Sequence, residues 1–318
     1  MTDGATRDPL LDRLLDTDPA LRWQVERDLA GAPPQVWEAT RTRTATEGMG
    51  ARLLARQDPE GTWAGGAYFP VEQPTVPGQP WTATTWSLNA LREWGVAADA
   101  LAGTSEKLES CRWEYDDLPY WDGEVDCCIN AFTVANGLWL GRDMSANAAW
   151  FTTHQLDDGG WNCEWVEGAT RSSFHSTLNS LIGLLTYEER TGGTEATRAA
   201  RKRGEEYLLA RRLLYRLSTG ERAPLPDVDR FAYPLRWRHD ALRGTDYFRR
   251  AHALDGGPRD PRLSEAVELV RAARGPDGLW VQGERDPGEM WFEVDVPAGE
   301  PSPWLTLYAT RVLDWWDR

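Results

Sequence analysis

A short motif that recurs along the chain constrains its fold more than any other feature. A polar residue, a glycine four positions later and a tryptophan two positions after that occur in three segments, 57–63, 155–161 and 274–280, and a degenerate copy covers 114–123. The spacing is about 50 residues or a multiple of it, which is typical of chains built from repeated structural units.

Each copy lies between two segments whose apolar residues have helical i, i+3, i+4 spacing. Helices are expected before the loops over 34–56, 98–111, 145–155, 195–217 and 262–274, and after them over 82–94, 127–140, 172–190, 238–253 and 303–316. With 10–16 and 20–29 these make about six helical hairpins. The one alternating run, 292–296, is a short strand candidate or a loop excursion.

Hairpins that cannot bury a face alone must stack, and six can close into a ring. The sequence therefore predicts an all-α fold, a single α/α toroid over 1–318, with a leading hairpin in 1–33 and the repeats in 34–318. The helices after the loops are small, apolar and hydroxylated, so we expect them to form the inner layer.

Charge and hydropathy exclude several partners. The 318 residues contain 50 acidic and 35 basic side chains, and this charge of −15 argues against nucleic acid and anionic membrane surfaces. No run approaches the roughly 18 apolar residues of a membrane span. The first 18 residues have no apolar stretch, so we expect no signal peptide and a cytoplasmic protein. The four cysteines do not form a disulfide framework.

Two expected inner helices begin with residues that bind metals. Asp126 and Cys128 open one helix and His175 opens the next. A carboxylate, a thiolate and an imidazole form a catalytic zinc set with one open position. Residues i and i+2 diverge on a helix, so this requires Asp126 at or before the N-cap. The alternative is a capping aspartate, a buried cysteine and a core histidine.

The other cysteines near this helix and the repeated tryptophans have different expected roles. Cys127 points about 100° away from Cys128 and is predicted to pack in the core. Cys163 is a weaker ligand candidate. The repeated Trp63, Trp161 and Trp280 are predicted to hold adjacent hairpins together.

Further candidates face the same expected cavity. His239 or Asp240 could act as an acid or base, and Arg238 could bind a substrate anion, unless Asp240 only caps its helix. Aromatic residues at helix starts could line an apolar substrate pocket or simply pack in the core: Trp81, Trp86, Trp237 and Trp304.

The motif and the ligand pattern resemble two related families. The loops resemble those of squalene-hopene and related terpenoid cyclases, although the catalytic Asp-x-Asp-Asp of the cyclases is absent. The Asp126-Cys127-Cys128 segment with His175 resembles the zinc site of protein prenyltransferase β subunits. That resemblance implies zinc bound by Asp126, Cys128 and His175, with the fourth position for a substrate thiolate. Asp122 and Glu124 stand where those enzymes have basic residues, so a diphosphate donor is not implied.

The leading hypothesis is a zinc-dependent transferase or cyclase. It would activate a thiol or water for prenyl or alkyl transfer to, or cyclisation of, a hydrophobic small molecule. One alternative is a metal-independent terpenoid cyclase that uses Asp122, Glu124 or Asp126 as its acid. Another is a non-catalytic toroid that binds a hydrophobic ligand or a partner protein.

Overall fold

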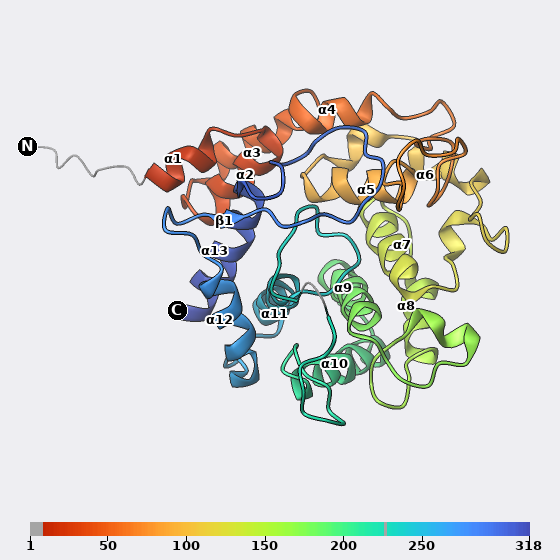
Figure 1. Cartoon of the computed structure of the whole chain (residues 1–318). Coiled ribbons are helices and arrows are strands. Elements are labelled where there is room, and N and C mark those ends of the chain that lie inside the picture. The colour runs from red at the N-terminus through yellow and green to blue at the C-terminus, as the bar shows by residue number, and fades with distance from the viewer. Residues whose placement is uncertain (1–8, 226–227) are drawn as a thin grey trace, which may run out of the picture.

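A computed structural model describes residues 9–225 and 228–318 and is mostly helical (Figure 1). Residues 1–8, part of the expected leading hairpin, lie outside the described residues. The α-helices are α1 (Pro9–Leu15), α2 (Pro19–Asp28), α3 (Pro34–Arg43), α4 (Gly48–Leu54), α5 (Thr84–Glu93), α6 (Thr104–Lys107), α7 (Cys127–Trp139), α8 (Ser145–Thr153), α9 (Phe174–Thr191), α10 (Glu195–Ala210), α11 (Ala241–Asp255), α12 (Ser264–Ala272) and α13 (Pro303–Asp317).

The helices after the repeated loops pack on one another in sequence order. Helix α5 packs on α7, α7 on α9, α9 on α11, and α11 on α13. Helix α13 then contacts α2, which contacts α4, and α4 returns to α5. Helices α8, α10 and α12 lie outside this series, each against its neighbours (Figure 1). The helical hairpins thus follow one another around the molecule.

The three repeated loops have the same hydrogen bonds. In each, the tryptophan backbone N–H donates to a threonine hydroxyl of the following helix, and the indole N–H donates to the carbonyl ten residues earlier. The backbone pairs are Trp63–Thr84, Trp161–Thr177 and Trp280–Thr306, and the indole pairs are Trp63–Leu53, Trp161–Phe151 and Trp280–Val270. All three indoles are buried, so the predicted role of these residues in joining hairpins is confirmed.

Helices before the loops are shorter than expected. The segment 34–56 divides into α3 and α4, because residues 44–47 form a turn in which Glu47 is extended, with a φ of −135° and a ψ of 157°. The segment 98–111 forms only α6 and two 3₁₀ turns, Ala98–Leu101 and Leu108–Ser110. Helices after the loops agree with the predictions to within a few residues.

Of the two alternatives for 292–296, a short strand or a loop excursion, the structure has the loop, because that segment has no ladder partner. Within the described residues the only two-stranded pairing joins β1 (Trp280–Val281) to β2 (Pro301–Ser302), antiparallel. The segment between β1 and β2 crosses the molecule to the long loop between α4 and α5 (Figure 1). There the backbone N–H of Gln79 donates to the carbonyl oxygen of Pro287, and the backbone N–H of Trp81 donates to the carbonyl oxygen of Glu289.

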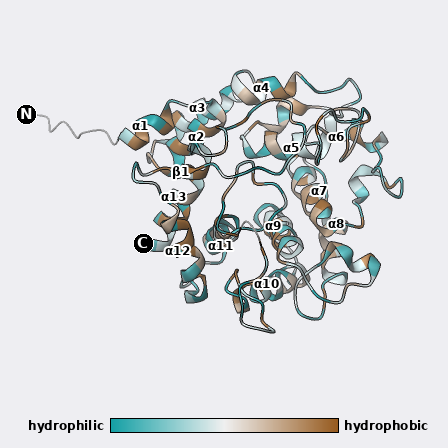
Figure 2. Cartoon of the chain, viewed as in Figure 1, coloured by the Kyte–Doolittle hydropathy of each residue, from teal (hydrophilic) through white to brown (hydrophobic). Residues whose placement is uncertain are grey.

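Helix α7 is the most thoroughly enclosed element. All of its residues from Cys127 to Gly137 are buried, and its side chains are largely apolar (Figure 2). It packs between α5 and α9, with α8 against its outer side. In the described part of the chain, no helix has both the length and the apolar character needed to cross a membrane.

Candidate metal centre and adjoining cavity

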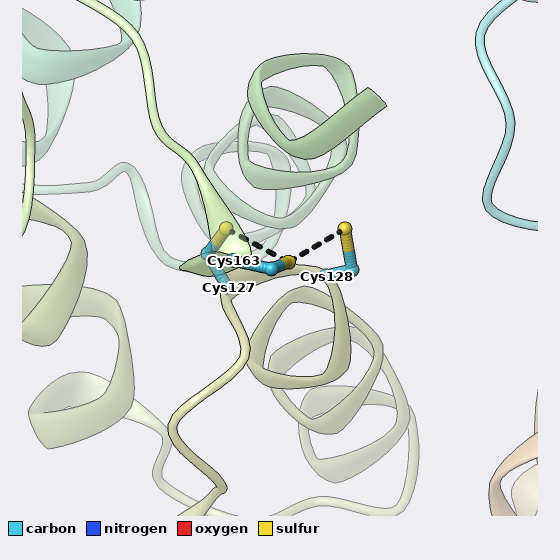
Figure 3. A group of neighbouring side chains, drawn as sticks. All are labelled: Cys127, Cys128 and Cys163. Atoms are coloured by element: carbon cyan, nitrogen blue, oxygen red, sulfur yellow. Dashed lines mark hydrogen bonds between the residues drawn. The ribbon is translucent and has the colours of Figure 1, made fainter. Parts of the chain in front are cut away.

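Three cysteine sulfurs converge at the start of helix α7 (Figure 3). The Sγ atom of Cys163 lies 3.4 Å from that of Cys127 and 3.3 Å from that of Cys128, and all three atoms lie within 4.8 Å of one another. A tetrahedral zinc ion with Zn–S bonds of about 2.3 Å holds its sulfur ligands roughly 3.8 Å apart. This three-cysteine group could therefore hold a metal ion with only a small expansion.

Local structure explains why these sulfurs meet. Cys127 and Cys128 are the first two residues of α7, whereas Cys163 begins the 3₁₀ turn Cys163–Glu167. The backbone N–H of Cys163 donates to the hydroxyl of Ser176 in the first turn of α9. Adjacent helical side chains diverge, and the sulfur of Cys163 lies between the two that have diverged (Figure 3).

The three cysteine thiols differ in acidity. Hydrogen bonds with Cys127 and Cys128 lower the pKa of Cys163 to about 2. The hydroxyl of Ser176 adds a third hydrogen bond to its sulfur. Burial raises the pKa of Cys127. The pKa of Cys128 is raised by the hydrogen bonds of Cys128 with Cys127 and Cys163. Cys163 is thus the most acidic of the three thiols, and a divalent cation would favour ionisation of the other two.

Asp126 lies beside this group without belonging to it. It occupies the N-cap position of α7, as the zinc prediction required, yet its side chain does not cap the helix. Burial and the charges of Cys163 and Glu124 raise its pKa to about 7. A carboxyl that accepts no helix N–H and lies next to a thiolate is available as a further ligand. Its role as a ligand stays a prediction.

Glu124 shapes the approach to α7. Its Oε2 atom accepts the backbone N–H of Asp126 at 2.8 Å, and burial raises its pKa. The turn depends on Gly123, which has a φ of +87° and where a Cβ atom would lie 2.3 Å from Oδ1 of Asn130. Glu124 therefore orders the backbone under the sulfurs. Asp122 is exposed on the far side of this turn.

His175 lies outside the sulfur group. Its Nδ1 atom accepts a hydrogen bond from the backbone N–H of His239 at 2.7 Å. Since a backbone N–H can only donate, the proton of the neutral imidazole must be on Nε2. Burial, followed by the charges of Arg243 and Arg238, lowers the pKa of His175 to about 4. In this arrangement Nε2 is a donor, so metal binding by His175 stays a prediction that needs another tautomer.

The other proposed acid–base residues are held by backbone contacts. The Nε2 atom of His239 bonds to the carbonyl of Leu213 at 2.8 Å, and burial lowers its pKa to about 3. Asp240 accepts the backbone N–H of Arg243 and caps α11, which matches the capping alternative. Arg238 forms an ion pair with Asp286 at 2.5 Å. Catalytic roles for His239 and Asp240 stay predictions.

An aromatic cavity lies beside helices α5 and α7. Its walls include Trp81, Trp86, Trp94 and Phe132, and the loop that carries Trp291 covers one side. Trp81 and Trp86 thus line a cavity, and their role in a substrate pocket stays a prediction. Trp304 instead stacks on Tyr233, with ring centroids 4.4 Å apart. Trp237 packs against the group that contains Trp81, Trp86 and Phe132, and its ring centroid lies 5.5 Å from that of His175.

The sulfur group and the cavity are adjacent. Phe132 lies one helical turn after Cys128 on the same face of α7 and lines the cavity. Tyr68 packs on Trp86 with ring centroids 4.8 Å apart, and burial together with the charges of Cys128, Asp126 and Cys163 raises its pKa. Asn179 donates both to Cys128 Sγ, at 3.4 Å, and to the carbonyl of Trp237. Side chains therefore connect the two sites without a break.

The sequence predicted that Cys127 packs in the core, and it gave Cys163 only as a weaker ligand candidate. That prediction treated helix direction as decisive for Cys127, and it did not place Cys163 near the start of α9. One signal was present in the sequence. Cys163 follows Trp161 by two residues, and the repeated loops bring each such tryptophan against the first turns of the next inner helix.

No protein-family model matches this chain, and no curated protein matches it significantly. The resemblance to cyclases and prenyltransferases therefore rests on the residues described above.

Proposed function

We propose that this protein is a zinc-dependent enzyme on an α/α toroid, in which Cys127, Cys128 and Cys163 hold the metal. The observation that carries the proposal is the meeting of three sulfurs at the start of a helix whose Phe132 lines an aromatic cavity. The succession of inner-helix contacts from α5 to α13 and back through α2 and α4 supports the ring.

Zinc suits this set of donors better than other common ions. Three thiolates in a tetrahedral arrangement select soft or borderline metals, and calcium and magnesium prefer oxygen ligands. Three protein ligands leave the fourth position for Asp126 or for a substrate atom. When bound, zinc would lower the pKa of a thiol or water in that position and make it a nucleophile.

The protein's own side chains would bind and orient the substrate. The aromatic walls would exclude water and hold an apolar group one helical turn from the sulfurs. Alkyl or prenyl-type transfer to, or cyclisation of, a hydrophobic small molecule fits this arrangement. The site residues Asp126 and His175 would then act beside the metal, either as a ligand or as a hydrogen-bond donor.

Metal analysis tests the proposal directly. We expect about one zinc ion per chain in the purified protein, lost in Cys163→Ser and kept in the matched control Cys111→Ser, since Cys111 lies outside the group. Metal-free protein in which a disulfide joins Cys163 to a neighbour would contradict the proposal and indicate a redox site.

Cobalt substitution separates a catalytic site from a structural one. An open fourth position would let an added small thiol change the visible spectrum of the Co²⁺ protein. A spectrum that no thiol or hydrophobic ligand changes would indicate a closed structural site. It would remove the enzymatic part of the proposal while leaving the metal.

A further inference from the structure

A positively charged side chain lies at the wall of the aromatic cavity without a charged partner. The guanidinium of Arg236 lies over the ring of Trp81, 4.5 Å from its centroid, and 5.7 Å from that of Trp86. Among the described residues it has no hydrogen bond and no ion pair. Burial lowers its pKa to about 10, so it remains charged at neutral pH.

The acidic groups nearest to Arg236 are already bound elsewhere. Asp286 forms its ion pair with Arg238. Glu93, which lines the same cavity, accepts a hydrogen bond from the hydroxyl of Tyr308 at 2.5 Å, and burial raises its pKa toward the neutral form. Leaving a cation in apolar surroundings without hydrogen bonds is costly, since the aromatic faces replace only part of its hydration.

We infer that the cavity binds a small amphipathic carboxylate, with the carboxylate on Arg236 and the apolar part between Trp81, Trp86 and Phe132. A guanidinium offers a planar pair of N–H groups that matches a carboxylate. A single cation balances a monoanion, whereas a phosphate ester dianion would bring an uncompensated charge into the apolar walls. This inference rests on the proposed function, because it names the class of molecule that the zinc enzyme acts on.

The size of the cavity limits the apolar part. The cavity has a volume of about 60 Å³, so a short chain fits as the structure stands. A longer one must displace the loop that carries Met290 and Trp291. Affinity should therefore rise by about fourfold for each added methylene group until the space is full, and then level off.

Calorimetric titration of the full-length protein tests this site. The probes are butanoate, hexanoate and octanoate, together with hexanamide and hexyl phosphate. We expect hexanoate to bind at least tenfold more tightly than hexanamide or hexyl phosphate. Arg236→Gln should abolish that preference, while the exposed Arg230→Gln should keep it. The circular dichroism of both variants would report any loss of folding.

Equal binding of hexanoate and hexanamide to the wild-type protein would overturn the inference, as would a preference that survives in folded Arg236→Gln. Tighter binding of hexyl phosphate would assign the site to phosphate esters instead, and no binding of any probe would also reject it. Repeating the titrations after treatment with a chelator separates the two proposals. A carboxylate preference that persists in a protein shown to lack a zinc site would leave Arg236 as a ligand site on its own.

Discussion

His239 donates its backbone N–H to Nδ1 of His175 at 2.7 Å and thereby determines which imidazole nitrogen carries a proton. Because Nε2 is protonated in this arrangement, that nitrogen can only donate a hydrogen bond and is not a metal ligand. The structure therefore separates two ligand sets for the same metal: three cysteines, or Asp126, Cys128 and His175.

Substitution of His175 and Cys127 distinguishes these sets. If the three cysteines bind zinc, His175→Ala should keep stoichiometric metal, whereas Cys127→Ala should weaken zinc binding by at least tenfold. Competition with a chromophoric chelator measures both affinities. The reverse result, with metal lost in His175→Ala and kept in Cys127→Ala, would establish the ligand set that the sequence first suggested.

Zinc binding should release protons. The pKa values of Cys127 and Cys128 are raised above the usual range of a thiol, so both carry protons at pH 7, whereas Cys163 does not. Loading the metal should release about two protons per ion, and affinity should fall steeply as the pH decreases. A pH indicator in weakly buffered solution measures this release. Release of no protons would show that the two thiols are not ligands.

Asp126 should make the metal-free protein less stable at high pH. Its folded pKa of about 7 exceeds the value of about 3.9 expected in the unfolded chain, so the folded state binds the proton more tightly. The stabilising contribution of the protonated form is complete below pH ~4 and is lost as the pH rises through about 7.

Asp126→Asn should remove this dependence. At pH 8 the metal-free variant should be about 1–2 kcal/mol more stable than the wild type, after allowance for partial exposure to solvent, and near pH 4 the two should be alike. Urea unfolding at both pH values measures the difference. Asp122→Asn, at an exposed neighbouring position, serves as the control and should change neither value. An unchanged pH dependence in Asp126→Asn would show that another group is responsible.

The three threonines that accept hydrogen bonds from the repeated loops should contribute similar amounts to the free energy of unfolding. Thr84, Thr177 and Thr306 each accept the backbone N–H of a loop tryptophan in a buried setting. Replacement of any one by valine leaves that N–H without a partner and should lower the free energy of unfolding by about 1–3 kcal/mol.

An exposed threonine gives the comparison for that experiment. Thr42→Val, on the surface of α3, should change the free energy of unfolding by less than about 0.5 kcal/mol. Chemical denaturation of the four variants would show whether the three buried sites behave alike. If only one of the three substitutions lowered the free energy of unfolding, the loops would differ in their contribution to stability despite their matching hydrogen bonds.

Much of the helical layout was predictable from the sequence because it depends on local information. The helices after the loops were placed within a few residues, since their apolar spacing and the flanking glycines and prolines act over short distances. The helices before the loops were less predictable. In 98–111 the helical pattern yields only one short helix and two 3₁₀ turns, because its neighbours, and not its own spacing, decide the backbone path.

By itself the sequence determined that the chain is helical, that its loops repeat, and that residues of metal-ligand type stand at the starts of two helices. The tertiary structure decided which of those residues meet. Cys163 joins Cys127 and Cys128 because a hydrogen bond to Ser176 holds its turn against α9, and His175 is set apart because the segment before α11 supplies a donor to its ring. Such contacts join residues 13 and 64 positions apart, and helical periodicity describes only the direction in which each side chain leaves its own helix.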